Sequence, residues 1–215
     1  MAIFEQMTEE LIQGNATAVS RLTREALDAG FPADAILEAG LIAGMNVVGT
    51  RFRNCEMFLP EVLTAARAMK AGVAELEPWL AAAGVKPAGK VLIGTVKGDI
   101  HDIGKNLVAI MLRGAGFEVV DLGVGVPAQK FVEAVVTHQP DIVGMSALLT
   151  TTMMQMKTSL AALSAAGVRD RVKVLIGGAP VNRAFAAEIG ADAYGRNAMD
   201  AVEKARELMR LSRDS

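Results

Sequence analysis

A histidine and two carboxylates lie close together near the middle of the chain, in a segment that reads VLIGTVKGDIHDIGKN from position 91 to 106. Neutral imidazole is a good ligand for a transition metal and a good general base. Asp99 comes two residues before His101, so its carboxylate can accept a hydrogen bond from one ring nitrogen and leave the other free to bind. A solvated loop is the alternative, but Gly98 and Gly104 frame this histidine and permit close approach to the backbone.

The residues on either side of this segment predict how it is positioned. Residues 91–96 are apolar and rich in β-branched types, with the length of a buried strand. An apolar-periodic helix follows from about Asn106. His101 therefore lies on a loop after a strand, which in an open α/β sheet is the edge where ligands bind.

The composition describes a folded protein of about two domains. The chain has 215 residues, of which 52% are hydrophobic and 21% charged, and its formal net charge is -2. No basic run favours nucleic acid or an anionic membrane surface as a partner. The first residues lack the features of a signal peptide, and no apolar run approaches about 18 residues, so we expect no membrane span. The single cysteine, Cys55, excludes an intrachain disulfide. We therefore expect a cytoplasmic protein.

Residues 1–88 are predicted to form a four-helix bundle. The first 80 residues or so contain no convincing strand and are rich in helix-forming types, with amphipathic segments at about 4–13, 15–29, 33–48 and 60–80. The loop at 49–59 carries apolar side chains that either plug the end of the bundle or cover a flat apolar ligand. A segment rich in Gly, Pro and Ala at 81–90 is typical of a linker.

Residues 89–215 are predicted to form a flavodoxin-like α/β domain. Five short apolar segments, at 91–96, 117–121, 142–146, 172–176 and about 193–194, alternate with helical ones. This alternation indicates a parallel five-stranded sheet, most simply of strand order 2-1-3-4-5. In that order the loops after strands one, three and four are neighbours, and the last two carry Ser146, Thr150–Thr152 and Gly177-Gly178. The threonines could instead cap a helix, and the glycines could simply form a turn.

The pattern of these three loops resembles the cobalamin-binding signature. Its parts are D-x-H-x-x-G from Asp99 to Gly104, S-x-L at Ser146 and Leu148, and G-G at 177–178, behind a helical bundle. With this set the chain is similar to the corrinoid proteins of multi-component methyltransferase systems and to the cobalamin module of methionine synthase. The resemblance implies a cobalamin whose own nucleotide base is detached from cobalt and replaced by a protein histidine.

The resemblance also implies roles for individual residues. His101 matches the lower axial ligand to the metal, Asp99 the carboxylate hydrogen-bonded to it, and Thr152 the hydroxyl that completes the relay, where familiar members have serine. Further cofactor-binding positions are implied around the nucleotide tail and the ring, and on the bundle over the upper face of the ring. Those in the α/β domain are Asp102, Ile103, Gly104, Ser146, Leu148, Thr150, Gly177 and Gly178, and those in the bundle are Phe52, Leu59 and Val62.

The function implied is that of a methyl carrier, a subunit of a methyltransferase system rather than a stand-alone enzyme. It would cycle between Co(I) and methyl-Co(III), taking methyl from a substrate:corrinoid methyltransferase that uses a methylamine, methanol or an aryl methyl ether. A second methyltransferase would remove the methyl group, and a reductive activase would restore the cobalt. When His101 leaves the metal, its ring is expected to take up a proton beside Asp99. The alternatives are a cobalamin-dependent sensor, a mutase subunit, and a flavodoxin-like module without corrinoid.

Overall fold

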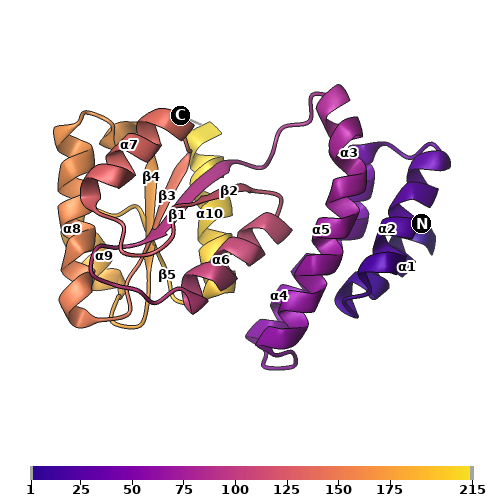
Figure 1. Ribbon diagram of the computed structural model, residues 1–215, viewed down its shortest axis with the longest axis horizontal. Coiled ribbons are helices and arrows are strands. Elements are labelled where there is room, and N and C mark those ends of the chain that lie inside the picture. The colour runs from indigo at the N-terminus through magenta and orange to yellow at the C-terminus, as the bar shows by residue number, and fades with distance from the viewer. Residues whose placement is uncertain (1, 214–215) are drawn as a thin grey trace. The chain divides into compact units, whose positions relative to one another are not determined.

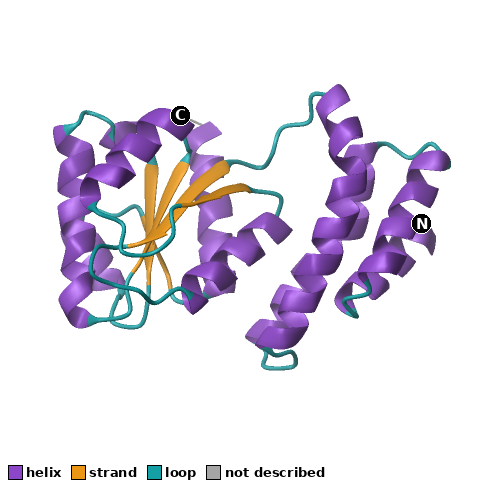
Figure 2. Ribbon diagram, viewed as in Figure 1, coloured by secondary structure: helices purple, strands orange, loops and turns teal. Residues whose placement is uncertain are grey.

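A computed structural model describes residues 2–213 (Figure 1). The chain forms two compact units, one containing the residues up to Lys86 and the other most of the residues from Pro87 onward. The first unit is entirely helical and the second contains the sheet (Figure 2). Each unit has its own buried apolar core and is described separately below.

The helical unit consists of four helical rods. They are α1 (Ala2–Ile12), α2 (Ala16–Asp28), a continuous rod made of α3 (Ala33–Ile36), η1 (Leu37–Ile42) and α4 (Ala43–Arg53), and α5 (Leu59–Ala82). The start of α2 follows local chemistry, because the Asn15 side chain accepts a hydrogen bond from the Ala18 amide at 3.2 Å. The predicted helical bundle is therefore confirmed.

The third rod differs from its prediction in two ways: η1 is π-helical, and α4 continues to Arg53 instead of ending near Val48. The widened turn lies where α1 packs closely, since a Cβ on Gly40 would lie 2.5 Å from the Met7 sulfur. The Thr8 hydroxyl also donates to the Gly40 carbonyl at 2.9 Å. A side-chain donor that takes a helical carbonyl is a known cause of such irregular turns.

The same rod, Ala33–Arg53, is long and apolar enough to cross a membrane by length and composition alone. No long apolar run marks it in the sequence, because Asp34 and Glu38 interrupt the apolar residues. In the structure 44% of its most apolar stretch is buried, and Ile36, Leu41 and Val48 expose no surface. Core helices of globular proteins pass the same test, so this rod is weak evidence for a membrane span, and the cytoplasmic location stays a prediction.

The sheet unit has five parallel strands in the order β2-β1-β3-β4-β5, as the sequence predicts. The strands are β1 (Lys90–Thr95), β2 (Glu118–Asp121), β3 (Ile142–Ser146), β4 (Lys173–Gly177) and β5 (Ala193–Gly195). The helices are α6 (Ile103–Gly114), α7 (Ala128–His138), α8 (Thr150–Ala165), α9 (Arg183–Ile189) and α10 (Ala198–Arg213), with a short turn η2 (Arg169–Arg171). In Figure 1, α7, α8 and α9 cover one face of the sheet and α6 and α10 the other.

Coverage on both faces explains why the central strands are continuous apolar runs, buried along nearly their whole length. Phe131 of α7 and Met156 and Leu163 of α8 are fully buried against one face. The register of the strands also brings three chain segments together, because Thr95 is paired with Ser146, and Ser146 with Gly177. The loops that follow these residues therefore start side by side at the carboxyl edge of the sheet.

Candidate functional site

The loop from Val96 to Asp102 begins with a tight turn. The Asp99 amide donates to the Val96 carbonyl at 3.1 Å, and Gly98, at the third position of this turn, has φ +79°. A positive φ at that position is typical of a type II turn and favours glycine. The turn directs the Asp99 side chain inward, so that none of it is exposed.

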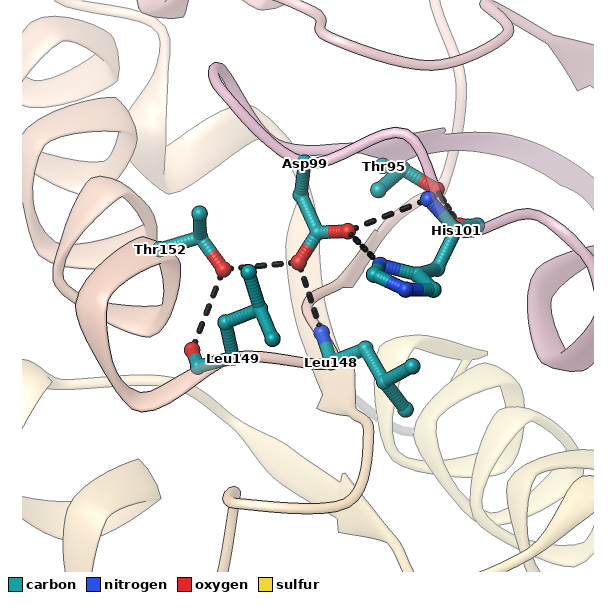
Figure 3. A network of polar contacts seen from close by, with 6 residues as sticks. All are labelled: Thr95, Asp99, His101, Leu148, Leu149 and Thr152. Atoms are coloured by element: carbon teal, nitrogen blue, oxygen red, sulfur yellow. Dashed lines mark hydrogen bonds and ion pairs between the residues drawn. The ribbon is translucent and has the colours of Figure 1, made fainter.

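Asp99 accepts hydrogen bonds at both carboxylate oxygens. One oxygen accepts from His101, from ring nitrogen Nδ1 at 2.7 Å and from the backbone amide at 3.1 Å. The other accepts from the Leu148 amide at 2.7 Å and from the Thr152 hydroxyl at 2.6 Å. Figure 3 shows the carboxylate between His101 on one side and Thr152 on the other. A buried carboxylate with both oxygens hydrogen-bonded can keep its charge.

The surroundings of Asp99 act on its pKa in opposite directions. Burial alone would raise the pKa, because it disfavours the charged form. The hydrogen bonds from Thr152, from the Leu148 amide and from His101 together outweigh burial and hold the pKa of Asp99 below its usual range. The carboxylate is therefore ionised at neutral pH and is a strong acceptor for the imidazole N–H.

This acceptor decides which histidine nitrogen is free. With Nδ1 donating to the carboxylate, the lone pair of the neutral ring is on Nε2. The His101 side chain is 48% exposed, so Nε2 belongs to a ring that a ligand can reach. The backbone of the same residue is fixed by the Thr95 hydroxyl, which donates to the His101 carbonyl at 2.9 Å.

Thr152 lies in the first turn of α8, which starts at Thr150, two residues before its predicted start. The residue before the helix, Leu149, makes no side-chain capping bond, so the interpretation of the threonines as helix caps is wrong. The Thr152 hydroxyl has one proton and two acceptors in range, Asp99 at 2.6 Å and the Leu149 carbonyl at 3.0 Å. The closer and charged acceptor gives the stronger hydrogen bond.

The glycines of the motif differ in what requires them. A Cβ on Gly178 would lie 1.8 Å from the Ala147 carbonyl oxygen, and the residue has φ +127°. The fold alone therefore requires this glycine, and Gly177 beside it approaches the Gly195 carbonyl with 3.0 Å to a Cβ. A Cβ on Gly104 would meet no atom within 4 Å and needs no unusual φ. Nothing among the described residues requires that glycine, which fits a ligand that lies close to the backbone there.

The remaining predicted residues of the α/β unit lie on or beside the same edge. Asp102 is exposed, and its carboxylate accepts from the Asn106 side chain at 3.0 Å. Ser146 ends β3 and is half-buried, and Thr150 is exposed. The apolar side chains here are unusually open to solvent: Ile100 is 78% exposed, Ile103 71% and Leu148 43%. Exposed apolar side chains around one polar binding group, here the His101 imidazole, are typical of a surface that a large, partly apolar ligand covers.

The three predicted residues of the bundle belong to the other unit. Phe52 near the end of α4 and Leu59 at the start of α5 are half-buried, whereas Val62 exposes no surface. Phe58, between them, is 67% exposed. A role for this end of the bundle over the upper face of a ring stays a prediction.

Sequence reasoning missed Lys105, Asn106 and Asp121, which form a polar network beside the histidine loop. Lys105 is 2% exposed, although lysine is rarely buried unless paired. A signal was present in the sequence, because Lys105 shares a helical face with the buried Ala109 and Leu112. A lysine on the buried face of a helix predicts a buried partner that can pair with its charge.

The donor set fits a metal that arrives with most of its ligands. Among residues 2–213 no group of three or more His, Cys, Asp or Glu side chains is arranged to hold a bare metal ion. One imidazole with its second nitrogen held by a carboxylate suits the single open position of a metal in a macrocycle. The exposed apolar side chains and the open Gly104 provide the surface that such a ring needs.

Comparison with known proteins points to the same class. Residues 89–203 match the B12 binding domain model, and residues 3–77 match a second model described as a B12 binding domain. The chain is 44% identical to dimethylamine corrinoid protein 3 of Methanosarcina acetivorans over 212 residues, covering 97% of this chain and 100% of that one. It is 44% identical to the trimethylamine corrinoid protein of Methanosarcina barkeri, with 97% of each chain covered.

A solved structure agrees with these relatives. The methanol:cobalamin methyltransferase complex MtaBC of Methanosarcina barkeri contains a chain that matches with a TM-score of 0.86 at 31% identity, covering 97% of this chain and 80% of that one. The chain therefore belongs to the family of B12-binding proteins, and cobalamin is its cofactor. Within that family it is a corrinoid protein of the methyl-carrying kind, as predicted, and the relatives give no support to a sensor.

Proposed function

We propose that this chain binds cobalamin at the carboxyl edge of its sheet, with His101 Nε2 as the lower axial ligand, and carries a methyl group between two methyltransferases. The observation that carries the proposal is the hydrogen bond of 2.7 Å between His101 Nδ1 and the buried Asp99 carboxylate. It fixes the tautomer, orients the ring and leaves Nε2 on a half-exposed side chain.

The other residues of the edge support this placement through their own positions. Thr152 and the Leu148 amide hold Asp99, so the carboxylate cannot turn away from the imidazole. Gly104 leaves the space beside the first turn of α6 open, and Gly177 and Gly178 keep side chains away from the loop after β4. Bound cobalamin would supply a cobalt ion that can accept a methyl group and release it. In this proposal Phe52 and Leu59 of the bundle cap the opposite side and exclude water, and Val62, which exposes no surface, would support that cap from within the bundle.

The relatives support methyltransferases as partners. Two are named for methylamines at 44% identity, and the methanol complex matches at 31%, so we propose a methylamine as methyl donor ahead of methanol. The methyl group would come from a substrate:corrinoid methyltransferase and leave through a second methyltransferase. A carrier that must pass through a strongly reduced metal also needs repair after accidental oxidation, so a reductive activase belongs to the system.

Nitrogen labelling tests the axial ligand directly. The protein is loaded with cobalamin and reduced to the Co(II) state, and its electron paramagnetic resonance spectrum is compared with and without ¹⁵N-histidine. If a histidine binds cobalt, the nitrogen splitting changes from triplets to doublets. Of the two histidines, His138 at the end of α7 is the control. His101→Gln should abolish the labelled splitting and His138→Gln should preserve it. Triplets that persist in the labelled protein would show that the cofactor's own base is bound, against the proposal.

A donor panel tests the carrier role. The loaded protein, reduced to Co(I), is mixed with purified methyltransferases specific for monomethylamine, dimethylamine, trimethylamine or methanol, each with its substrate. Conversion to the methyl-cobalt absorption spectrum is expected with one methylamine pair and only slowly with methanol. Equal rates for free cobalamin and for the protein would refute a carrier role, because free cofactor then serves as well.

A further inference from the structure

Lys105 is a buried ammonium that links the loop after β1 to the loop after β2. Its Nζ donates to the Asp121 carboxylate at 2.5 Å and to the Asn106 side-chain carbonyl at 2.6 Å. Asp121 ends β2 and is 29% exposed, whereas Lys105 is 2% exposed. Burial of a cation costs stability unless it is paired and hydrogen-bonded, so a position that keeps one there calls for a reason beyond packing.

The two partners of Lys105 make hydrogen bonds to different loops: Asn106 to the histidine loop, and Asp121 to the loop after β2. On one side, the side-chain amide of Asn106 donates to the Asp102 carboxylate at 3.0 Å. The backbone amide of Asn106 donates to the Asp102 backbone carbonyl at 2.7 Å. These bonds hold the end of the histidine loop, one residue after His101. On the other side, the second oxygen of the Asp121 carboxylate accepts from the Gly123 amide at 2.9 Å. That bond holds the start of the loop after β2.

The loop after β2 in turn holds the start of the histidine loop. The Gly125 amide donates to the Asp99 carbonyl at 2.9 Å, and the Gly123 carbonyl accepts from the Thr95 amide at 3.0 Å. Thr95 also donates through its hydroxyl to the His101 carbonyl. The segment from Asp99 to Asp102 is therefore held at both ends, at Asp99 by the loop after β2 and at Asp102 by Asn106. Lys105 connects these two sets of contacts, because it binds both Asn106 and Asp121.

We propose that Lys105 is a positioning residue, whose bridge between Asn106 and Asp121 sets how firmly His101 is presented to cobalt. The inference rests on the proposed role of His101 as axial ligand. Outer contacts of a metal-binding histidine typically change affinity or activity by about 10- to 100-fold when removed. Lys105 reaches the histidine loop only through Asn106 and Asp121, whereas Asp99 contacts the imidazole directly, so we expect an effect at the lower end of that range, about tenfold.

The test removes the bridge without leaving a buried charge unpaired. Lys105→Met combined with Asp121→Asn neutralises both partners, and an asparagine oxygen can still accept from the Gly123 amide. The matched control is Lys90→Met combined with Glu118→Gln, because that pair, at 3.1 Å, joins β1 to β2 at the amino ends of the strands, away from the histidine loop. Asn106→Ala is a milder second variant, which cuts the link to Asp102 and keeps the ion pair.

Two measurements follow for each variant. In the protein without cofactor, amide hydrogen exchange at Gly125 should become about tenfold faster when the bridge is lost, since the opening of the loop costs less. In the cobalamin-loaded Co(II) protein, the ratio of histidine-bound to histidine-free cobalt, read from the ¹⁵N splitting, should fall by about tenfold. The control pair should change neither quantity, and Asn106→Ala should shift both in the same direction by a smaller factor.

The outcomes separate this inference from the proposed function. If the wild-type protein shows no histidine splitting, the proposed axial ligand is wrong, whatever Lys105 does. If wild type shows it and the double variant keeps the same ratio and the same exchange rate, Lys105 is a structural ion pair only and the inference is overturned. If the double variant does not fold, the same two readouts on Asn106→Ala decide, and unchanged values there overturn it equally.

Discussion

Replacing Thr152 with valine tests the central link of the site. Valine has nearly the shape of threonine, so the substitution removes the hydroxyl and little else. The hydroxyl lies 2.6 Å from a carboxylate oxygen of Asp99, and both residues are buried. The change therefore deletes one hydrogen bond to a buried charge and leaves the packing of α8 against the loop in place.

The magnitude follows from the kind of bond that is lost. A hydrogen bond to a charged group contributes about 1.5–3 kcal/mol to stability. At about 1.4 kcal/mol per pKa unit, losing it raises the pKa of Asp99 by roughly one to two units. Because that pKa starts below its usual range, the carboxylate stays ionised at pH 7 in the variant. We therefore expect a loss of about 1.5–3 kcal/mol in the free energy of unfolding at pH 7, without protonation of Asp99.

The assay is a double-mutant cycle on the protein without cofactor, measured by urea unfolding at pH 7. The variants are Thr152→Val, Asp99→Asn and the combination of the two. If the hydroxyl acts through the charge of Asp99, Thr152→Val should cost at least about 1 kcal/mol less in the Asp99→Asn background than in wild type. Thr152→Ser restores the hydroxyl and should recover most of the stability.

Thr158 is the control on the same helix, because its hydroxyl is exposed and donates a long hydrogen bond of 3.4 Å to the Met154 carbonyl. Thr158→Val should change the free energy of unfolding by less than about 0.5 kcal/mol. Strictly additive costs for Thr152→Val and Asp99→Asn would refute the reasoning, since additivity means that the two groups do not stabilise each other. A serine variant as unstable as the valine variant would refute it as well.

Three further changes have definite expected outcomes. Gly178→Ala should lower the free energy of unfolding by about 3 kcal/mol or more, because its Cβ would lie 1.8 Å from the Ala147 carbonyl oxygen; urea unfolding measures this. Gly104→Ala should leave the cofactor-free protein as stable or up to about 1 kcal/mol more stable, yet weaken cobalamin binding about tenfold in an absorbance titration, because the added methyl group enters only the ligand's space. Hydrogen bonds from Arg24 and Ser20 lower the pKa of Glu75 from 4.5 to about 2. The ionised Glu75 should therefore stabilise the bundle above pH 4.5, and this contribution should be lost as the pH falls toward 2. Glu75→Gln should remove this part of the acid dependence of unfolding.

Gly178→Ala and Glu75→Gln each have a matched control, and Gly104→Ala has an outcome that would contradict it. Gly167 has φ +68° and no atom within 4 Å of a Cβ, so Gly167→Ala should cost only the backbone strain of about 1–2 kcal/mol. If Gly178→Ala costs no more than Gly167→Ala, the Ala147 carbonyl moves aside easily and the close approach does not require a glycine. Unchanged cobalamin affinity in Gly104→Ala would place the ligand elsewhere. The control for Glu75 is Glu25→Gln, which removes an exposed carboxylate of an i,i+4 pair. If Glu25→Gln changes the acid dependence of unfolding as much as Glu75→Gln does, that dependence does not come from Glu75.

The predictions from sequence succeeded where the local pattern carries the information. The strand order followed from five apolar segments that alternate with helices, because right-handed crossovers leave few arrangements for such a chain. The pairing of Asp99 with His101 followed from a spacing of two residues on one loop. The partner Thr152 lies 53 residues away, and its position came from the family resemblance, since spacing alone does not show which hydroxyl a folded chain brings to a carboxylate.

Other features had no local signal. The π-helical turn at η1 depends on α1, which packs against Gly40 and donates a side-chain hydrogen bond to it. The burial of Lys105 depends on Asp121 at the end of another strand. Gly178 follows from the approach of the Ala147 carbonyl, which the register of β3 and β4 fixes.

The class of sheet, the helical bundle before it and the histidine with its carboxylate could all be predicted from local patterns, because strand period, helix period and a two-residue spacing are properties of the chain alone. The tertiary structure decided which oxygen of Asp99 each donor meets, which glycine the fold requires and which one only a ligand could require. It also decided that an unremarked lysine lies buried between the two loops. Those features depend on contacts between segments far apart in the chain, and such contacts exist only after the strands have taken their order.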